Sequence, residues 1–441
     1  MIQTIRNAWK VAELRNKLLF VVFALLIFRL GSAIPVPFID TEVLSTYMSA
    51  QSATIFGLIN VMSGDAFSQA TLFALGIQPY INSSIIIQLL TIAIPALERL
   101  AKEGGEEGKK KIAAITRYTT VGIALLQGFG YYTLIRSYGN VLNIPDGFGI
   151  WGAIIIILSF VAGSAFVMWL GEQITEFGIG NGISIILFAG IVSRGPRMVE
   201  TIVRGVQVWA GREITGYSAL HPAFIPVIII GMLALVVFIV FITNAERRIP
   251  VQYAKRVVGR KMYGGQSSHI PMKVNMSGVL PIIFAQSIAS LPATIGMFVP
   301  SAQTEGSGWY TFLQVFDSTG VIYSVVYVLL IIFFSYFYST IQFDPVEVSN
   351  NLKKNGGFIP GFRPGKPTAD FFRKVLSKIT LFGAIYLGIV AILPTITGNI
   401  MGVSSLAIGG TSIIIVVGVA LETVKALEAQ LMMRHYKGFL E

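Results

Sequence analysis

The sequence lacks cysteine altogether and has only three histidines, His221, His269 and His435. The absence of cysteine excludes disulfides, thiolate metal sites and cysteine nucleophiles. Charged residues are also scarce, at 12% of the chain, whereas soluble domains carry about 25%. Hydrophobic residues make up 54%, and the mean hydropathy is +0.71. We therefore expect an all-α polytopic membrane protein and not a soluble enzyme.

Groups that could perform chemistry inside the membrane are missing as well. The acidic residues fall in loops or at the ends of apolar stretches, whereas ion-coupled transporters usually place ionisable groups within their spans. There is no G-x-x-x-x-G-K-[ST] phosphate loop, so the chain does not itself use ATP. An intramembrane protease would need Ser with His, paired Asp, or H-E-x-x-H in the bilayer, and the sequence has none of these. We predict no catalytic residue, no metal and no cofactor.

What the sequence does contain is a series of apolar stretches of about 20 residues, the length that crosses a bilayer. Ten are expected, near 18–38, 73–94, 115–135, 152–171, 182–202, 223–244, 275–298, 319–342, 376–396 and 402–422. The fifth is the weakest, because its continuous apolar run ends before Arg194. The N-terminus resembles a signal peptide, but Arg29 interrupts its apolar run and no convincing cleavage site follows. We read it as a retained first span.

The net charge of +11 orients these spans. Almost all lysines and arginines fall on the side that holds both termini; the exceptions are Arg29, Arg136 and the arginines of 194–212. The positive-inside rule makes the basic side cytoplasmic. Five spans precede the external hinge 206–222 and five follow it, so the halves 1–205 and 223–441 have opposite orientations, as in an inverted repeat.

One apolar stretch, from residue 55 to residue 90, is broken. Its second half, from about Phe73, is long enough to span, but its first half is short and holds Gly57, Asn60 and Asp65. Irregular or half-length backbone survives at membrane depth only where protein buries it or a cavity adjoins it. The break therefore predicts a cavity with a short helix in or under it.

Isolated amides and hydroxyls lie in the predicted spans. They are Ser84, Gln88, Gln127, Gln286 and Ser287, together with Asn82 and Ser83. Hydrogen bonds between such groups average well below ~1 kcal/mol in membranes, which suits an interface that must open. Ordinary polar packing between helices is the alternative.

Two predicted cytoplasmic loops, 245–274 and 343–375, are long and strongly basic. Their charge alone could reflect topology and attraction to anionic lipid, at about 1 kcal/mol per basic residue. The Pro-Gly content of the second loop would in addition stiffen a projection that presents Arg363 at its tip. We favour a docking surface for acidic protein or ribosomal RNA phosphate.

Several long motifs make the chain resemble the SecY/Sec61-alpha family, the central subunit of the Sec protein translocase, over essentially its whole length. They include F-R-L-G-S-A-I-P-V-P, A-L-G-I-Q-P-Y-I-N-S-S-I-I-I-Q-L-L, G-I-G-N-G-I-S-I-I-L-F-A-G-I-V, Q-Y-A-K-R, H-I-P-M-K-V-N-M-S-G-V-L-P-I-I-F-A, N-L-K-K-N-G-G-F-I-P-G-F-R-P-G and G-G-T-S-I-I-I-V-V. The resemblance implies ten helices in two inverted five-helix halves around a central pore, with a short plug helix before the second span. It also implies a bacterial plasma (inner) membrane protein with both termini cytoplasmic.

The resemblance assigns roles residue by residue. The pore ring would be Ile77, Ile81, Leu187, Ile283 and Ile415, with a second layer of Ile183, Val279 and Thr411. The family usually has Ile where this chain has Leu187. The plug would be Ile55, Phe56, Gly57, Leu58, Ile59, Asn60, Val61, Met62, Ser63, Gly64 and Asp65. Asp65 replaces a small residue often found there. The lateral gate would hold Ser84, Gln88, Gln127, Gln286 and Ser287. The docking residues would be Arg247, Arg248, Lys255, Arg256, Arg260 and Arg363.

The implied partners are the SecE and SecG membrane subunits, the SecA ATPase, the ribosome with its RNA, signal sequences and nascent chains, and anionic lipids. The competing hypothesis is a secondary transporter with inverted repeats and a discontinuous helix. The missing intramembrane acids and the large basic loops favour a conduit for unfolded protein.

Overall fold

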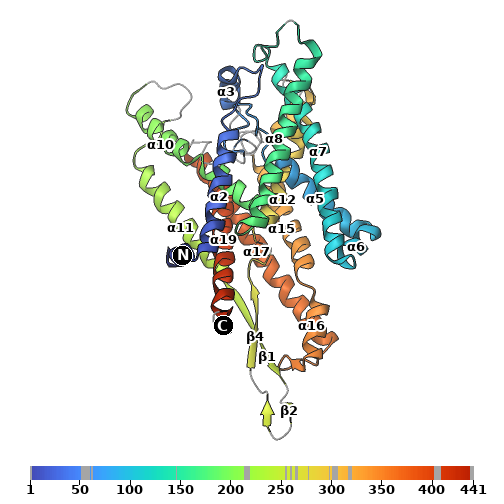
Figure 1. Cartoon of the computed structure of the whole chain (residues 1–441). Coiled ribbons are helices and arrows are strands. Elements are labelled where there is room, and N and C mark those ends of the chain that lie inside the picture. Colours follow the sequence, from blue (N-terminus) through green and yellow to red (C-terminus); the bar gives the residue numbers. More distant parts are fainter. Residues whose placement is uncertain are drawn as a thin grey trace.

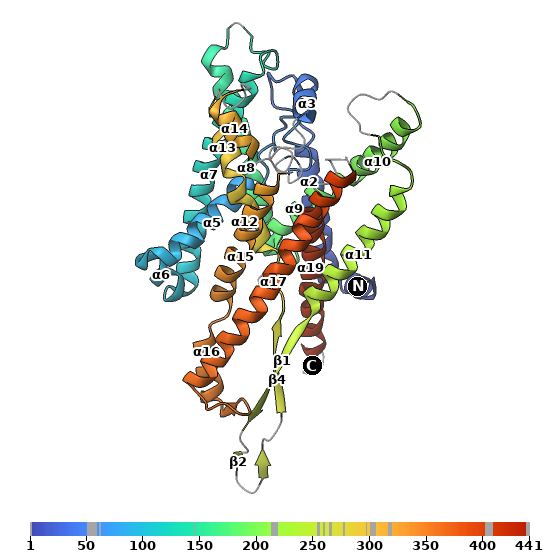
Figure 2. The same ribbon diagram turned by 180° about the vertical axis from the view of Figure 1, so that it is seen from behind.

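The chain folds into a bundle of long helices from which a group of strands projects at one end (Figure 1). The computed structural model describes residues 2–50, 60, 63–145, 147–212, 219–253, 256–258, 261–263, 267–276, 278–296, 298–299, 306–315, 320–401 and 409–437. Both termini lie on the side of the bundle from which the strands project, as the view from behind also shows (Figure 2). This arrangement agrees with a multi-pass membrane protein that carries its large polar loops on one side.

Among the residues that the structure describes, five helices are, by length and composition, able to cross a membrane on their own. These are α8 (Gly149–Phe177), α9 (Gly182–Val192) continued by α10 (Gly195–Trp209), α11 (Phe224–Asn244), α15 (Val321–Gln342) and α17 (Lys366–Met401). Three more long helices stand where spans one, three and ten were expected: α2 (Ala12–Gly31), α7 (Gly105–Ser137) and α19 (Gly409–Lys437). They contain 20, 33 and 29 residues, and at 1.5 Å per residue even the first is about 30 Å long. The count of ten spans stays a prediction.

The second span differs from its predicted bounds. Its helix α5 covers Gln78–Ala93 and not 73–94, and the chain then bends by 105° into α6 (Pro95–Lys102). Two local features fix the start: Gly76 has a positive φ of 53°, and Pro79 occupies the first turn, where a missing N–H costs nothing. The irregular residues before the helix, among them Phe73, are buried in protein, which is the condition for such backbone at membrane depth.

The seventh span is shorter than expected, and the first lies closer to the N-terminus than expected. The seventh begins at Leu280, after Gly278 with a φ of 63°, and is divided into α12 (Leu280–Ala289) and α13 (Leu291–Gly296). The prediction of a continuous helix from residue 275 was therefore wrong at its start. The first span, α2, ends at Gly31 and not at residue 38. The Pro35 region instead pairs with the chain that leads to α5, through Val36 N–H to the Ala70 carbonyl at 3.1 Å.

The two long basic loops contain strands, which the sequence did not predict. The first forms β1 (Glu246–Tyr253), β2 (Arg256–Val258), β3 (Lys261–Tyr263) and β4 (Ser267–Lys273), and the second contributes β5 (Gly357–Phe358). Strand β1 lies between β4 and β5, with Gln252 opposite Phe358. A separate small core around Ile249, Met272 and Phe372 supports this sheet. The two loops therefore form one platform.

The remaining described helices are short and lie at the two ends of the bundle. They are α1 (Ile2–Lys10), α3 (Thr41–Ala50), α14 (Gly308–Val315) and α16 (Pro345–Lys354). The largest buried core draws on both halves of the chain, from Ala24 in α2 to Val419 in α19. Its centre is the place where α5, α9, α12 and α19 approach one another, and the candidate site lies there.

Candidate functional site

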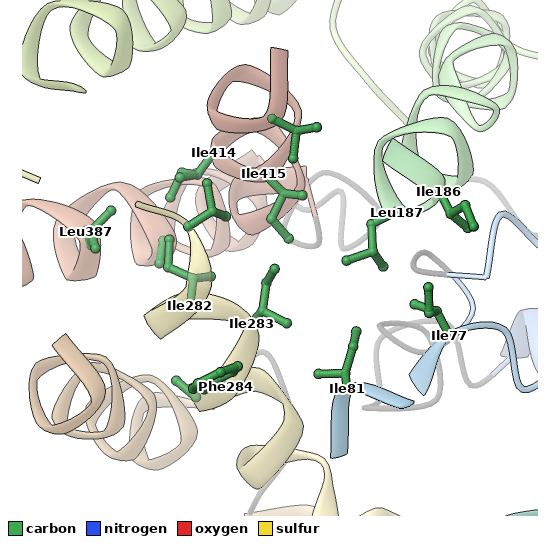
Figure 3. Packing of buried hydrophobic residues seen from close by; sticks show 14 of the residues in the cluster. Ile77, Ile81, Ile186, Leu187, Ile282, Ile283, Phe284, Leu387, Ile414 and Ile415 are labelled. Atoms are coloured by element: carbon green, nitrogen blue, oxygen red, sulfur yellow. The ribbon is translucent and has the colours of Figure 1, made fainter. Parts of the chain in front are cut away.

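Five aliphatic side chains converge at the centre of the bundle. Ile77 and Ile81 come from the start of α5, Leu187 from α9, Ile283 from α12 and Ile415 from α19, and they point toward a common space (Figure 3). All five belong to the main core and are at most 5% exposed. The predicted ring residues are thus brought together from segments more than 300 residues apart in sequence. The ring contains no polar side chain.

Local features define where two of the helices that contribute to this ring, α9 and α12, begin. The Asn181 side chain accepts hydrogen bonds from the Ile183 and Ser184 N–H groups at 3.0 and 3.3 Å, so α9 begins at a defined residue. In α12, Pro281 stands in the first turn. A helix that starts at a fixed residue presents Leu187 or Ile283 at a fixed angle to the ring.

The predicted second layer lies one helical turn away from the ring. Ile183 is partly buried against the main core, while Val279 and Thr411 are buried. Val279 is the residue that precedes α12, and Thr411 is in the first turn of α19. Spacing of four residues keeps Ile183 and Leu187 on one face of α9.

A cavity of about 490 Å³ adjoins the ring where α8 ends and α9 begins. Ile81, Leu187 and Ile283 form part of its wall, and Arg117 and Glu172 line it as well. These two charged residues form an ion pair, with Arg117 Nε 2.8 Å from Glu172 Oε1. The sequence places acidic residues at the ends of apolar stretches, but no pattern in it predicts this pair. The cavity therefore changes from charged to apolar as it approaches the ring.

Four of the five predicted gate residues lie on α5 and α12, two helices through which the halves of the chain make contact. Helix α12 packs against α5 and α15, and α5 packs against α7. Ser84 and Gln88 of α5 line the cavity and are joined by a hydrogen bond of 3.4 Å. Gln127, Gln286 and Ser287 are buried. Within the described part of the chain, Gln286 Oε1 and Ser287 Oγ find no hydrogen-bond partner. Buried polar atoms without partners weaken the contact between these helices.

Only part of the predicted plug can be described. Asn60, Ser63, Gly64 and Asp65 are described, whereas Ile55, Phe56, Gly57, Leu58, Ile59, Val61 and Met62 lie outside the described residues. Asp65 forms ion pairs of 3.0 Å with both Arg194 and Arg197. In the sequence these two arginines contribute only to the charge pattern that predicts topology, because no linear motif links them to Asp65.

Of the predicted docking residues, Arg247, Arg248, Arg256 and Arg363 lie in the described part of the two loops. Arg247 and Arg248 of β1 are exposed, and Arg248 Nε lies 2.7 Å from Glu246 Oε1. Arg363 is also exposed, in a turn whose glycines, Gly361 and Gly365, have φ values of 86° and 100°. Arg256 is in β2, while Lys255 and Arg260 lie outside the described residues. Arg247 and Arg248 thus lie in the sheet itself, and Arg363 lies in a turn that follows β5, the strand through which the second loop joins the sheet.

The described residues contain no cluster of three or more His, Asp or Glu side chains that could hold a metal ion. The site consists of a cluster of converging apolar side chains, a partly charged cavity, a polar interhelical contact and a basic platform.

Comparison with known proteins gives a consistent result. The family model described as SecY matches residues 71–424. The chain is 44% identical to the protein translocase subunit SecY of Streptomyces coelicolor, over the full length of both chains. It resembles a solved structure described as that of a protein conducting channel, with a TM-score of 0.62, 17% identity and coverage of 94% of this chain and 91% of that one. It also resembles Sec61 in the canine ribosome-channel complex from the endoplasmic reticulum, with a TM-score of 0.57, 17% identity and the same coverage.

Proposed function

The chain belongs to the SecY family of protein-translocation channel subunits, and from that premise we propose that it conducts unfolded secretory polypeptides across the bacterial plasma membrane and releases transmembrane segments sideways into lipid. The observation that carries this proposal is the convergence of Ile81, Leu187, Ile283 and their ring partners, which come from four helices of both halves. The protein is a channel subunit and not an enzyme.

The ring would act as a seal through dewetting. A narrow apolar collar excludes water and ions, because neither finds a partner in it. Flexible aliphatic side chains can still be pushed aside by a moving polypeptide. The segment from Ile55 to Asp65 would rest beneath this collar as a plug in the resting channel.

Lateral release would take place between α5 and α12, flanked by α7 and α15. The unpartnered Gln286 and Ser287 oxygens support this proposal, because separating the helices then breaks few hydrogen bonds. Signal sequences and nascent transmembrane helices would enter lipid through this opening. The charged cavity beside the ring, with Arg117 and Glu172, would form the aqueous approach.

The platform of β1, β4 and β5 would be the docking surface for the SecA ATPase or the ribosome, including its RNA. Exposed arginines from two loops that share one sheet suit phosphate or carboxylate recognition. The structural similarity of this chain to Sec61 in a ribosome-channel complex supports this proposal. SecE and SecG are the expected small membrane subunits, and anionic lipids would attract the basic side, which would be cytoplasmic together with both termini.

Reconstitution tests the function directly. The complex, purified from native membranes and identified by mass, is placed in proteoliposomes with SecA, ATP and a precursor that carries a signal sequence. We expect protection of the precursor from external protease, which should depend on ATP and on the signal sequence. Proton- or sodium-driven uptake of a small solute without precursor translocation would instead support the secondary transporter.

A further inference from the structure

A second cavity, of about 680 Å³, lies at the end of the bundle opposite the strands, where the chain turns from α7 into α8 (Figure 1). Phe129, Tyr132 and Arg136 of α7 form one wall, and the start of α8 with the connection between the two helices forms the rest. The strands belong to the loops expected in the cytoplasm, so this end is the predicted external one, and we call the space the external cavity. Its volume falls within the range of about 300–1,000 Å³ that is typical of small-molecule sites.

The walls of the external cavity are held by the rest of the N-terminal half. The Asn143 N–H donates to the Phe38 carbonyl at 2.9 Å, which ties the connection to the chain between α2 and α3. Ile144 packs so closely on α8 that a Cβ added to Gly152 would lie 2.7 Å from its Cγ2 atom. Tyr132 is buried in the core that these segments share. The hydrogen bond and the packing therefore define the shape of the cavity.

Polarity changes along the external cavity. Spacings of three and four residues place Phe129, Tyr132 and Arg136 on one face of α7, and at 1.5 Å per residue Phe129 and Arg136 are about 10 Å apart along the helix axis. Arg136 is exposed in the last turn of α7, while Phe129 lies further inside the predicted third span. Ile150 and Ala153 of α8 add apolar wall. The cavity is thus charged at the level expected for lipid headgroups and apolar at the level expected for acyl chains.

Arg136 has no protein partner that would account for its charge. Most arginines expected on the external side engage a protein oxygen, namely Arg29, Arg194, Arg197 and Arg204. Arg136 has no hydrogen bond or ion pair within the described part of the chain. A cation in the last turn of a helix is stabilised by the helix dipole, which explains an arginine at this position but not the cavity beside it.

We propose that the external cavity binds an anionic glycerophospholipid of the outer leaflet, with the lipid phosphate on Arg136 and an acyl chain along Phe129. A guanidinium group matches the geometry of phosphate and binds it through two parallel hydrogen bonds. The neighbouring side chains face lipid, since Phe129 is 48% and Ile150 is 74% exposed, so a lipid can enter from the bilayer. This site is separate from the basic cytoplasmic loops, and it does not depend on the proposed function.

The first test measures lipid binding to the complex directly. The complex, purified from native membranes and depleted of lipid in detergent, is mixed with phosphatidylglycerol or with phosphatidylcholine of the same chains, and bound lipid is counted by native mass spectrometry. The parent should bind one phosphatidylglycerol about tenfold more tightly than Arg136→Gln does, and only the parent should prefer it to phosphatidylcholine. Arg212→Gln is the matched control and should behave like the parent, because Arg212 is an exposed arginine of the predicted external side that does not line this cavity.

The second test separates the acyl chain from the headgroup. Ala153→Leu narrows the apolar part of the cavity without changing charge and should weaken phosphatidylglycerol binding to a similar extent. Glycerophosphate, which has the phosphate but no chains, should not displace the lipid from the parent. The melting temperature of the parent should rise with added phosphatidylglycerol, because a ligand that binds only the folded state stabilises it. It should rise less in Arg136→Gln and in Ala153→Leu.

A photocrosslink identifies the occupant even if a variant at Arg136 fails to fold. The chain has no cysteine, so Ile150→Cys can carry a single benzophenone label at the mouth of the cavity. In vesicles that contain phosphatidylglycerol, irradiation should add the mass of one phospholipid to the chain. A crosslink to another protein would instead show that the cavity is a subunit contact, and the proposal would be wrong.

Three further results would also overturn the proposal. The first is equal retention of phosphatidylglycerol by the parent and Arg136→Gln, or equal retention of both lipids by the parent. The second is displacement of the lipid by glycerophosphate, which would indicate a site for the headgroup alone. The third is a lower melting temperature of Arg136→Gln without lipid, together with an undiminished rise when lipid is added, which would leave Arg136 with a role in the helix dipole only.

Discussion

Ile81 of α5 and Ile283 of α12 face each other (Figure 3), and both line the same cavity. Each is 4% exposed, and their helices pack directly on one another. The pair therefore belongs both to the apolar ring and to the contact between α5 and α12. A single change at this contact should affect sealing and lateral opening together.

Replacing Ile81 and Ile283 with Ser should make the resting channel leak ions. Each change removes a buried side chain, worth about 2–5 kcal/mol of packing in an Ile truncation, and adds a hydroxyl that lets water persist in the collar. We expect resting conductance in planar bilayers to rise by about tenfold or more, the equivalent of at least 1.4 kcal/mol.

Ile282→Ser is the matched control for this measurement. Ile282 is buried in the same helix but points away from the ring (Figure 3). The Ile282→Ser variant should melt at a lower temperature, but its resting ion conductance should be unchanged. An unchanged resting conductance in the Ile81 and Ile283 variant, with the fold intact, would remove these residues from the seal.

Deleting Phe56 to Gly64 should give brief channel openings and weaker discrimination between signal sequences. The deletion removes the body of the predicted plug while leaving Asp65 and the buried segment after it. Single-channel recordings and export of a reporter with a defective signal sequence measure the two effects. A Gly-Ser replacement of residues 213–218, in the external hinge, is the control for shortening or altering an external segment. Behaviour identical to that of the intact chain would mean that this segment is not a plug.

Hydropathy predicted the helices that are continuous. The sixth span, expected at 223–244, is observed at Phe224–Asn244, because an uninterrupted apolar run has no alternative to a helix in lipid. It could not predict where α5 and α12 begin. Those starts depend on positive φ angles at Gly76 and Gly278 and on prolines in the first turn, and these features do not alter the mean hydropathy of a window.

The motifs predicted aliphatic side chains that the fold brings together, but they did not predict the contacts between distant polar residues. Ile81, Leu187 and Ile283 could be assigned because each lies in a long matching motif. The pairing of Asp65 with Arg194 and Arg197 had no such signal. This pairing depends on the break between α9 and α10, which places both arginines beside Asp65, a residue far upstream in the N-terminal half. The sequence did not predict the strands that join the two basic loops for a similar reason. Strand β5 has only two residues, and only its pairing with β1 defines it as a strand.

Replacing Gln286→Leu should strengthen the closed gate. The Gln286 Oε1 atom is buried and has no partner within the described part of the chain, and an unsatisfied buried group costs about 1–3 kcal/mol. The variant should melt at a higher temperature in detergent and should release transmembrane segments into lipid more slowly.

Ser339→Ala provides the opposite case, because Ser339 Oγ lies 2.8 Å from Thr380 Oγ1 and its removal should lower the melting temperature. A Gln286→Leu variant that is less stable, or that releases segments faster, would show that this amide stabilises the closed gate.

Reversing the charge at Arg363 should impair driven transport without affecting membrane insertion of the protein itself. Arg363 is exposed in the glycine turn beside the sheet that joins both basic loops. If it contacts ribosomal RNA phosphate, Arg363→Glu should weaken ribosome binding and reduce the slope of log K against log salt by about 1. If it contacts an acidic surface of SecA, ATP-dependent translocation should slow while ribosome binding is retained.

Arg373→Glu is the control, because Arg373 is an exposed arginine of the same loop that pairs with Asp370 in α17. Equal losses in both variants would assign the effect to the overall charge of the loop. Normal translocation and normal ribosome binding in Arg363→Glu would exclude a docking role for this residue.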